Sequence, residues 1–148
     1  MKLTWRLLAA AVCAAFLTLL ATWPGHADEG GGPRPGCIGD SFRGTLDSTK
    51  AICSDKYLVR MQPNGDLVLR EISSGRACWA SGTRAGGDAS ATFHQTMVGP
   101  FVTIDSVSQG KLATLSGSIP RATRFDEVSA NVNDRGEFWI GYTRVAGC

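Results

Sequence analysis

The stretch MQPNGDLVLR, residues 61–70, predicts a tight β-hairpin and decides much of the fold. Alternating apolar and polar residues flank Pro63, Asn64 and Gly65 on both sides. Proline suits the first central position of a type I turn, asparagine suits the second, and glycine suits the left-handed position that follows. The sequence therefore predicts a hairpin with a bulged three-residue loop.

This loop sets the register of the hairpin, with Gln62 opposite Asp66 and Arg60 opposite Val68. A two-residue Asn-Gly turn would mix polar and apolar residues on both faces. With the bulged loop, one face is apolar and is expected in the core: Tyr57, Val59, Met61, Leu67 and Leu69. The other face is expected to be exposed, and it carries Gln62, Asp66, Val68 and Arg70.

Two faint internal repeats suggest three similar units. GRACWASGT, residues 75–83, aligns with GKLATLSGS, about 35 residues later. GDLVLR, residues 65–70, aligns with GEFWIG, about 70 residues later. A second hairpin is expected to turn at residues 73–75 and continue through Trp79, a core aromatic. Each unit would form a small sheet, so three sheets would pack around a shared core.

The N-terminus has the features of a secretory signal peptide over residues 1–27. Lys2 and Arg6 precede an apolar run, and Gly25 and Ala27 suit a cleavage site before Asp28. A retained transmembrane helix is the alternative, although the run is short for one. Residues 28–36 are rich in glycine and proline and are expected to form a flexible linker, followed by one domain over residues 37–148. The mature chain is expected to be secreted and not membrane-bound.

The charge and the cysteine content limit the classes of partner that the protein is expected to bind. The chain has 15 Lys and Arg and 13 Asp and Glu, and the signal peptide holds two basic residues and no acid. The mature chain is thus near neutral and has no basic field for nucleic acid. Four cysteines survive cleavage, which favours two disulfides over a metal site. Of three pairings, we favour Cys53 with Cys78, which would staple one hairpin unit, and Cys37 with Cys148, which would tie the chain ends.

The first hairpin resembles the bulb-type, mannose-binding (monocot-type) lectin domain. That family carries QxDxNxVxY three times, each followed by a strand similar to WASGT. Here QPNGDLVLR followed by ACWASGT matches the first unit, and the other units match in spacing more than in letters. The resemblance extends over residues 37–148 and implies an all-β fold of the β-prism II type, with three antiparallel four-stranded sheets. It leaves a homodimer through the C-terminal strands open.

The resemblance also implies a site for a mannose-like carbohydrate. Gln62 and Val68 stand at the motif's Gln and Val, Asn64 and Asp66 exchange its Asp and Asn, and Arg70 replaces its Tyr. A carboxylate accepts hydrogen bonds from sugar hydroxyls, an amide accepts and donates, and valine covers an apolar patch. Arginine can only donate, which favours an acidic or sulfated ligand.

The two other units lack this set of groups. They offer Gln95, Met97 and Gly99, and then Asn133, Arg135 and Glu137. Two functions therefore remain: a secreted lectin with at most one working site, or a protein-binding or inhibitory module that has lost sugar binding. No cofactor or metal is expected. His94 is the single histidine of the mature chain, and no nucleophile motif accompanies it, so an enzyme is not expected.

Overall fold

The structure is a computed structural model, and it describes residues 36–84, 88–120 and 128–148. The predicted signal peptide and, except for Gly36, the predicted linker lie outside the described residues. All regular secondary structure in the described ranges is β-strand. Within these ranges no helix is long and apolar enough to cross a membrane.

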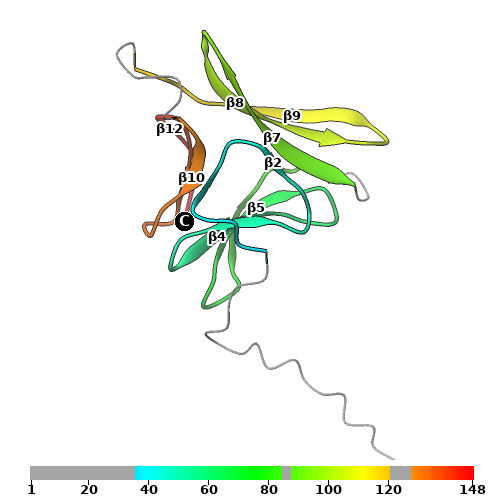
Figure 1. The fold of residues 1–148 in the computed structure, drawn as a ribbon. Coiled ribbons are helices and arrows are strands. Elements are labelled where there is room, and N and C mark those ends of the chain that lie inside the picture. The colour runs from blue at the N-terminus through cyan, green and yellow to red at the C-terminus, as the bar shows by residue number, and fades with distance from the viewer. Residues whose placement is uncertain (1–35, 85–87, 121–127) are drawn as a thin grey trace, which may run out of the picture.

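The strands form three antiparallel four-stranded sheets, which confirms the predicted all-β fold with three sheets (Figure 1). The first sheet contains β3 (Ala51–Cys53), β4 (Tyr57–Met61), β5 (Leu67–Glu71) and β6 (Ala77–Ala80). The second contains β2 (Thr45–Leu46), β7 (Ala89–Thr96), β8 (Gly99–Ser106) and β9 (Gly110–Ser116). The third contains β1 (Ser41–Phe42), β10 (Ala130–Val132), β11 (Glu137–Ile140) and β12 (Thr143–Gly147).

The three sheets share one construction, as the repeats predict. In each sheet the register shifts once between the third and fourth strands, at 69/70, 104/105 and 138/139. Such bulges bend a strand and increase its twist. The turns before β6 and β9 also match, because Gly75 and Gly110 both have positive φ, at 67° and 73°. The internal repeat is therefore a repeat of sheet geometry.

The core lies where the inner faces of the three sheets meet. Side chains alternate along a strand, so each sheet can present one apolar face inward. Ile52, Val59 and Leu69 are side by side across the first sheet, and all three are fully buried. Trp79 packs against this core, with its ring centroid 6.3 Å from that of Phe138 in the third sheet. This contact confirms that Trp79 is a core aromatic.

The first hairpin has the predicted register and turn. Arg60 is opposite Val68, and the Gln62 N–H donates to the Asp66 carbonyl at 2.8 Å. The Gly65 N–H donates to the Gln62 carbonyl at 3.0 Å, and Gly65 has φ 89°. Of the five residues predicted for the core face, four are fully buried and Tyr57 is half-buried.

The predicted disulfide pairing is wrong, although all four cysteines are paired. The bonds join Cys37 to Cys53 and Cys78 to Cys148. Cys53 and Cys78 are on opposite edge strands of the first sheet, about 14 Å apart at the usual strand spacing, which is too far for a disulfide. Cys37 instead lies beside β3, where its backbone forms an isolated parallel β-bridge with Ala51.

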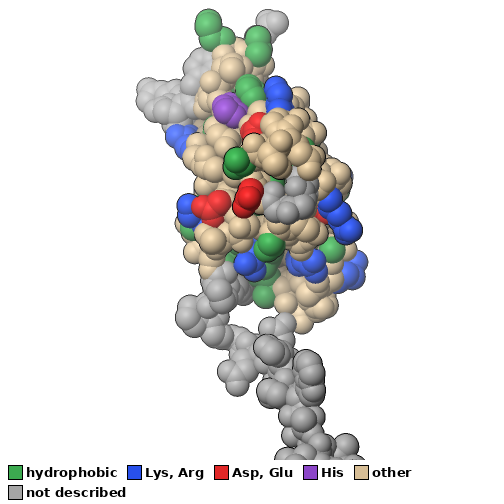
Figure 2. Space-filling view, turned by 90° about the vertical axis from the view of Figure 1, so that its right-hand side faces the viewer, with side chains coloured by type: hydrophobic (Ala, Val, Ile, Leu, Met, Phe, Trp, Pro, Cys, Tyr) green, Lys and Arg blue, Asp and Glu red, His purple; other side chains and the backbone are tan. Residues whose placement is uncertain are grey.

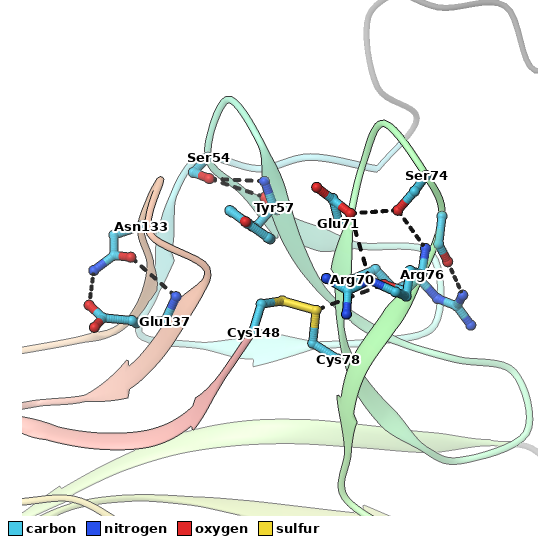
Figure 3. The surroundings of a disulfide bond; sticks show 11 residues. Ser54, Tyr57, Arg70, Glu71, Ser74, Arg76, Cys78, Asn133, Glu137 and Cys148 are labelled. Atoms are coloured by element: carbon cyan, nitrogen blue, oxygen red, sulfur yellow. Dashed lines mark hydrogen bonds and ion pairs between the residues drawn. A yellow bond between two sulfur atoms is a disulfide. The ribbon is translucent and has the colours of Figure 1, made fainter.

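The bond between Cys78 and Cys148 joins two different sheets (Figure 3). Cys78 belongs to β6, the edge of the first sheet, and Cys148 follows β12, the edge of the third. The last residue of the chain is thus tied to its own domain, so its sulfur is not free for a bond between chains.

Replacing Gly65 with valine should lower the free energy of unfolding by more than about 1 kcal/mol, because positive φ penalises a β-branched residue. Gly65→Asn should cost less, because asparagine tolerates the left-handed region. Denaturant melts of both variants measure the difference. Equal stability of the valine variant and the parent protein would contradict the bulged turn.

Non-reducing peptide mapping should recover Cys37 with Cys53 and Cys78 with Cys148. The second bond closes a loop of sequence separation 70 and the first a loop of 16. In the chain-entropy view, replacing both cysteines of a pair by serine should therefore cost about 4 kcal/mol for the longer loop and about 3 kcal/mol for the shorter. A larger loss for the shorter loop would argue against this explanation.

Candidate functional site

The predicted site residues lie together on the outer face of the first sheet. Val68 occupies the centre of this face, paired with Arg60 on β4 and with Ala80 on β6. Asp66 and Arg70 are two residues to either side of it along the chain, so their side chains leave the sheet on the same side. Gln62 is opposite Asp66, and Asn64 is in the turn. The sequence therefore predicted correctly which residues share this face.

The prediction that this face is exposed is wrong: Asp66 and Val68 are buried, and Gln62 and Arg70 are half-buried. Asp66 and Val68 each keep only 3% of their surface accessible. The chain after β6 continues alongside the hairpin: the Ser81 N–H donates to the Leu67 carbonyl at 2.9 Å, and Thr83 Oγ1 donates to the Gly65 carbonyl at 2.8 Å. The alternation within one hairpin could not reveal a neighbouring segment that covers its end.

Asp66 is a buried carboxylate with one oxygen in use. Its Oδ2 accepts from Arg84 Nε at 2.9 Å, and Arg84 itself is largely exposed. Its Oδ1 is buried and has no hydrogen-bond partner among the described residues. Buried polar atoms are normally satisfied, so an unpartnered carboxylate oxygen calls for a donor. Asp66 Oδ1 is therefore a buried acceptor that the described residues leave unsatisfied.

The remaining predicted residues are held in place by the turns. Asn64 Oδ1 accepts from the Asp66 N–H at 3.1 Å, so its side chain supports the loop. Arg70 Nη1 donates to the Gly75 carbonyl at 2.6 Å, which fixes the guanidinium beside the β5–β6 turn (Figure 3). Gln62 is half-buried. The face thus combines an acceptor, an amide, a guanidinium and the buried Val68.

The third sheet repeats the turn but not this chemistry. The Asn133 N–H donates to the Glu137 carbonyl at 3.1 Å, and the Gly136 N–H donates to the Asn133 carbonyl at 3.0 Å. Here, however, Glu137 Oε2 accepts from Asn133 Nδ2 at 2.8 Å, and it also accepts from Trp139 Nε1 at 3.3 Å and Arg135 Nη2 at 2.9 Å. The carboxylate is already occupied by its own neighbours.

These contacts stabilise the charged form of Glu137. The hydrogen bond from Asn133, followed by that from Trp139 and the charge of Arg135, lowers the pKa of the Glu137 carboxyl. Glu137 is also 3.5 Å from Arg144 Nη1 on β12. The third sheet therefore has a closed network of hydrogen bonds where the first sheet has an open acceptor.

The second sheet lacks the turn altogether. Thr96 pairs directly with Gly99, so only Met97 and Val98 connect β7 and β8. Both side chains are almost fully exposed, at 94% and 98%. Gln95 lies in the next pair, opposite Pro100, and its Nε2 is buried without a partner among the described residues.

His94 has structural contacts. Its Nε2 lies 2.9 Å from Thr103 Oγ1, and its ring stacks on Phe101 with centroids 4.8 Å apart. Both partners are on the neighbouring strand β8. His94 is thus a half-buried strand residue.

The sequence did not predict an open polar groove of about 850 Å³ between the first and third sheets. Its lining includes three carboxylates, and the Asp134 Oδ1 accepts from the Asp55 N–H at 2.9 Å. A hydrogen bond from Ser54 is the main cause that lowers the pKa of Asp134. The lining residues come from separate chain segments, so no local motif could have found the groove: Cys37, Asp40, Ser41, Cys53, Ser54, Asp55, Ser129, Asn131, Val132, Asn133 and Asp134.

Replacing Glu137 with glutamine should destabilise the protein at neutral pH and much less in acid. The lowered pKa means that the carboxylate contributes stability above its ordinary value of 4.5, and that this contribution is lost as the pH falls through the folded-state pKa. Denaturant melts of both proteins at pH 7 and pH 3 test this. A difference in stability that does not change with pH would contradict the network.

Comparisons with known proteins give one distant structural similarity to report. The chain is similar to a monomeric monocot mannose-binding lectin from Gastrodia elata, with 21% sequence identity and a TM-score of 0.42. The matched region covers 72% of this chain and 97% of the lectin. No protein-family model matches the chain. No curated protein matches it either. A similarity this distant carries no functional conclusion.

Proposed function

We propose that this protein is a secreted, non-catalytic carbohydrate-binding protein of the lectin type. It would bind a mannose-like sugar on the outer face of the first sheet, through Gln62, Asn64, Asp66, Val68 and Arg70. The observation that supports this most directly is Asp66, whose buried Oδ1 has no partner among the described residues. A sugar hydroxyl can donate to that oxygen.

The neighbouring groups suit the rest of a pyranose ring. Gln62 is opposite Asp66 and can both donate and accept, which matches a second hydroxyl. Val68, next along the same face, is nearly fully buried and forms the apolar floor beneath these polar groups. Arg70 adds donors at the far end. Sugar recognition requires such a mixture, because each hydroxyl that leaves water must find a partner.

The proposal is limited to one site per chain. In the third sheet the corresponding acid, Glu137, is engaged by Asn133, Arg135 and Trp139. In the second sheet the corresponding tip carries Met97 and Val98. Binding to a branched glycan through several sites of one chain is therefore not part of the proposal.

The disulfides support an extracellular role. Two disulfides hold the domain, and disulfides persist mainly in oxidising compartments. An exported lectin would meet glycans at cell surfaces, which is where we place its ligand.

One observation favours a second candidate, a protein-binding module. Met97 and Val98 form an apolar tip at the end of the long β7–β8 hairpin, and exposed large apolar side chains that cluster can mark a protein contact. This tip and the first-sheet site lie on different sheets, so variants of each can be tested separately.

Titration calorimetry of the oxidised mature domain with mannose and a mannose oligosaccharide tests the lectin function. We expect millimolar or tighter binding. Asp66→Asn keeps the shape of the side chain but removes its charge, and it should weaken binding by at least tenfold, or about 1.4 kcal/mol. Gln62→Ala should weaken binding without affecting the ion pair of Asp66 and Arg84.

Gln95→Ala is the matched control, because Gln95 holds the position of Gln62 in the second unit. It should leave sugar binding unchanged. Absence of heat with a panel of neutral and acidic glycans, on a sample whose circular dichroism shows a folded protein, would exclude the lectin function. A pull-down that compares the parent protein with the double variant Met97→Ser/Val98→Ser would then test the protein-binding alternative.

A further inference from the structure

We infer that the first-sheet site is built for an anionic glycan, a sugar that carries a sulfate or carboxylate group. This inference rests on the proposed function, because it specifies the ligand class of the same site. It is drawn from the positions of three arginines, Arg60, Arg70 and Arg84, relative to Val68.

These three arginines surround Val68 on the outer face. Arg60 is the direct partner of Val68 on β4. Arg70 is two residues further along β5, and Arg84 contacts Asp66, two residues before Val68. Direct and next-nearest positions on one face of a sheet are only about 5 to 7 Å apart. A ligand lying over the sheet at this position is therefore within reach of all three long side chains.

The face keeps an excess of positive charge. Asp66 is the carboxylate that pairs with Arg84, and it is nearly fully buried. Glu71 follows Arg70 but leaves the sheet on the opposite side, where it lies 3.8 Å from Arg76. Arg60 and Arg70 have no ion-pair partner among the described residues. The excess is local, since the mature chain as a whole is near neutral.

Several Lys and Arg side chains lie along the lower part of the face drawn in Figure 2. Acidic side chains are fewer in this region of the view.

The geometry of the cations suits an oxyanion. A guanidinium presents parallel N–H donors that match the oxygens of a sulfate or carboxylate. Arg70 is already held through Nη1 by the Gly75 carbonyl, which reduces the freedom it must lose on binding. Arg60 is exposed and free to turn toward the ligand.

The same face also predicts the orientation of the ligand. Asp66 repels an anionic group and accepts from hydroxyls, whereas Arg60 and Arg70 attract the anion. The neutral hydroxyls should therefore be placed at Asp66 and Gln62, and the sulfate or carboxylate toward Arg60 and Arg70. A neutral sugar would leave the charges of these two cations without an anionic partner.

The test compares a mannose oligosaccharide with the same oligosaccharide carrying one sulfate, by calorimetry with the full mature chain. We expect the sulfated form to bind at least tenfold tighter at about 0.05 M salt, and the preference to shrink at higher salt because exposed charges are screened. Arg60→Gln should reduce the preference severalfold while leaving affinity for the neutral form unchanged. Arg70→Gln should weaken binding of both forms, and of the sulfated form more. Arg43→Gln, an exposed arginine between β1 and β2, is the matched control and should have no effect.

Each outcome separates this inference from the proposed function. Equal binding of both forms overturns the anionic preference but leaves a working lectin. Binding of neither form, nor of a uronate oligosaccharide, on a folded sample overturns both. If Arg43→Gln and Arg60→Gln weaken binding of the sulfated oligosaccharide equally, the sulfate is attracted by the charge of the whole protein and not by this site. That result also overturns the inference.

Discussion

The fold depends on one constraint: each of its sheets is too small to bury its own apolar face. A four-stranded sheet of short strands exposes Ile52, Val59 and Leu69, or their counterparts, unless two other sheets cover them. The three inner faces therefore have to form together. The order of the strands reinforces this, since β1 and β2 leave the N-terminal region to complete the third and second sheets. The two disulfides then fasten edges that the hydrogen-bonded ladders leave open.

This constraint also explains why the outer faces are free to differ. The inner residues and the bulges are repeated in all three sheets, because the shared core requires similar shapes. The outer residues carry no such requirement. Asp66 and Glu137 occupy the same position after the same turn, yet Glu137 is one methylene longer and reaches Asn133, Trp139 and Arg135. Asp66 is shorter, and it meets only Arg84 from a later segment.

What the sequence could predict was local. Pro63, Asn64 and Gly65 define a turn whose chemistry fixes the register, and the register fixes which side chains share a face. The disulfide pairing could not be found in this way, because Cys78 and Cys148 meet only when two sheets pack edge to edge. The burial of Asp66 and its contact with Arg84 depend on the path of the chain after β6. The alternation of apolar and polar residues in the hairpin does not predict that path. The groove between the first and third sheets could not be predicted either, because its lining residues come together only when the two sheets pack.

The contact between Asp66 and Arg84 affects how binding can occur. If a ligand had to displace Arg84, it would leave a buried carboxylate without its cation, and such a loss is costly. The free oxygen of Asp66 avoids this, because a hydroxyl can donate to Oδ1 while Arg84 remains on Oδ2. Arg84 then stays paired with Oδ2, and its exposed side chain remains beside the proposed site. In the proposed site, a sugar would therefore not have to displace the ion pair of Asp66 and Arg84.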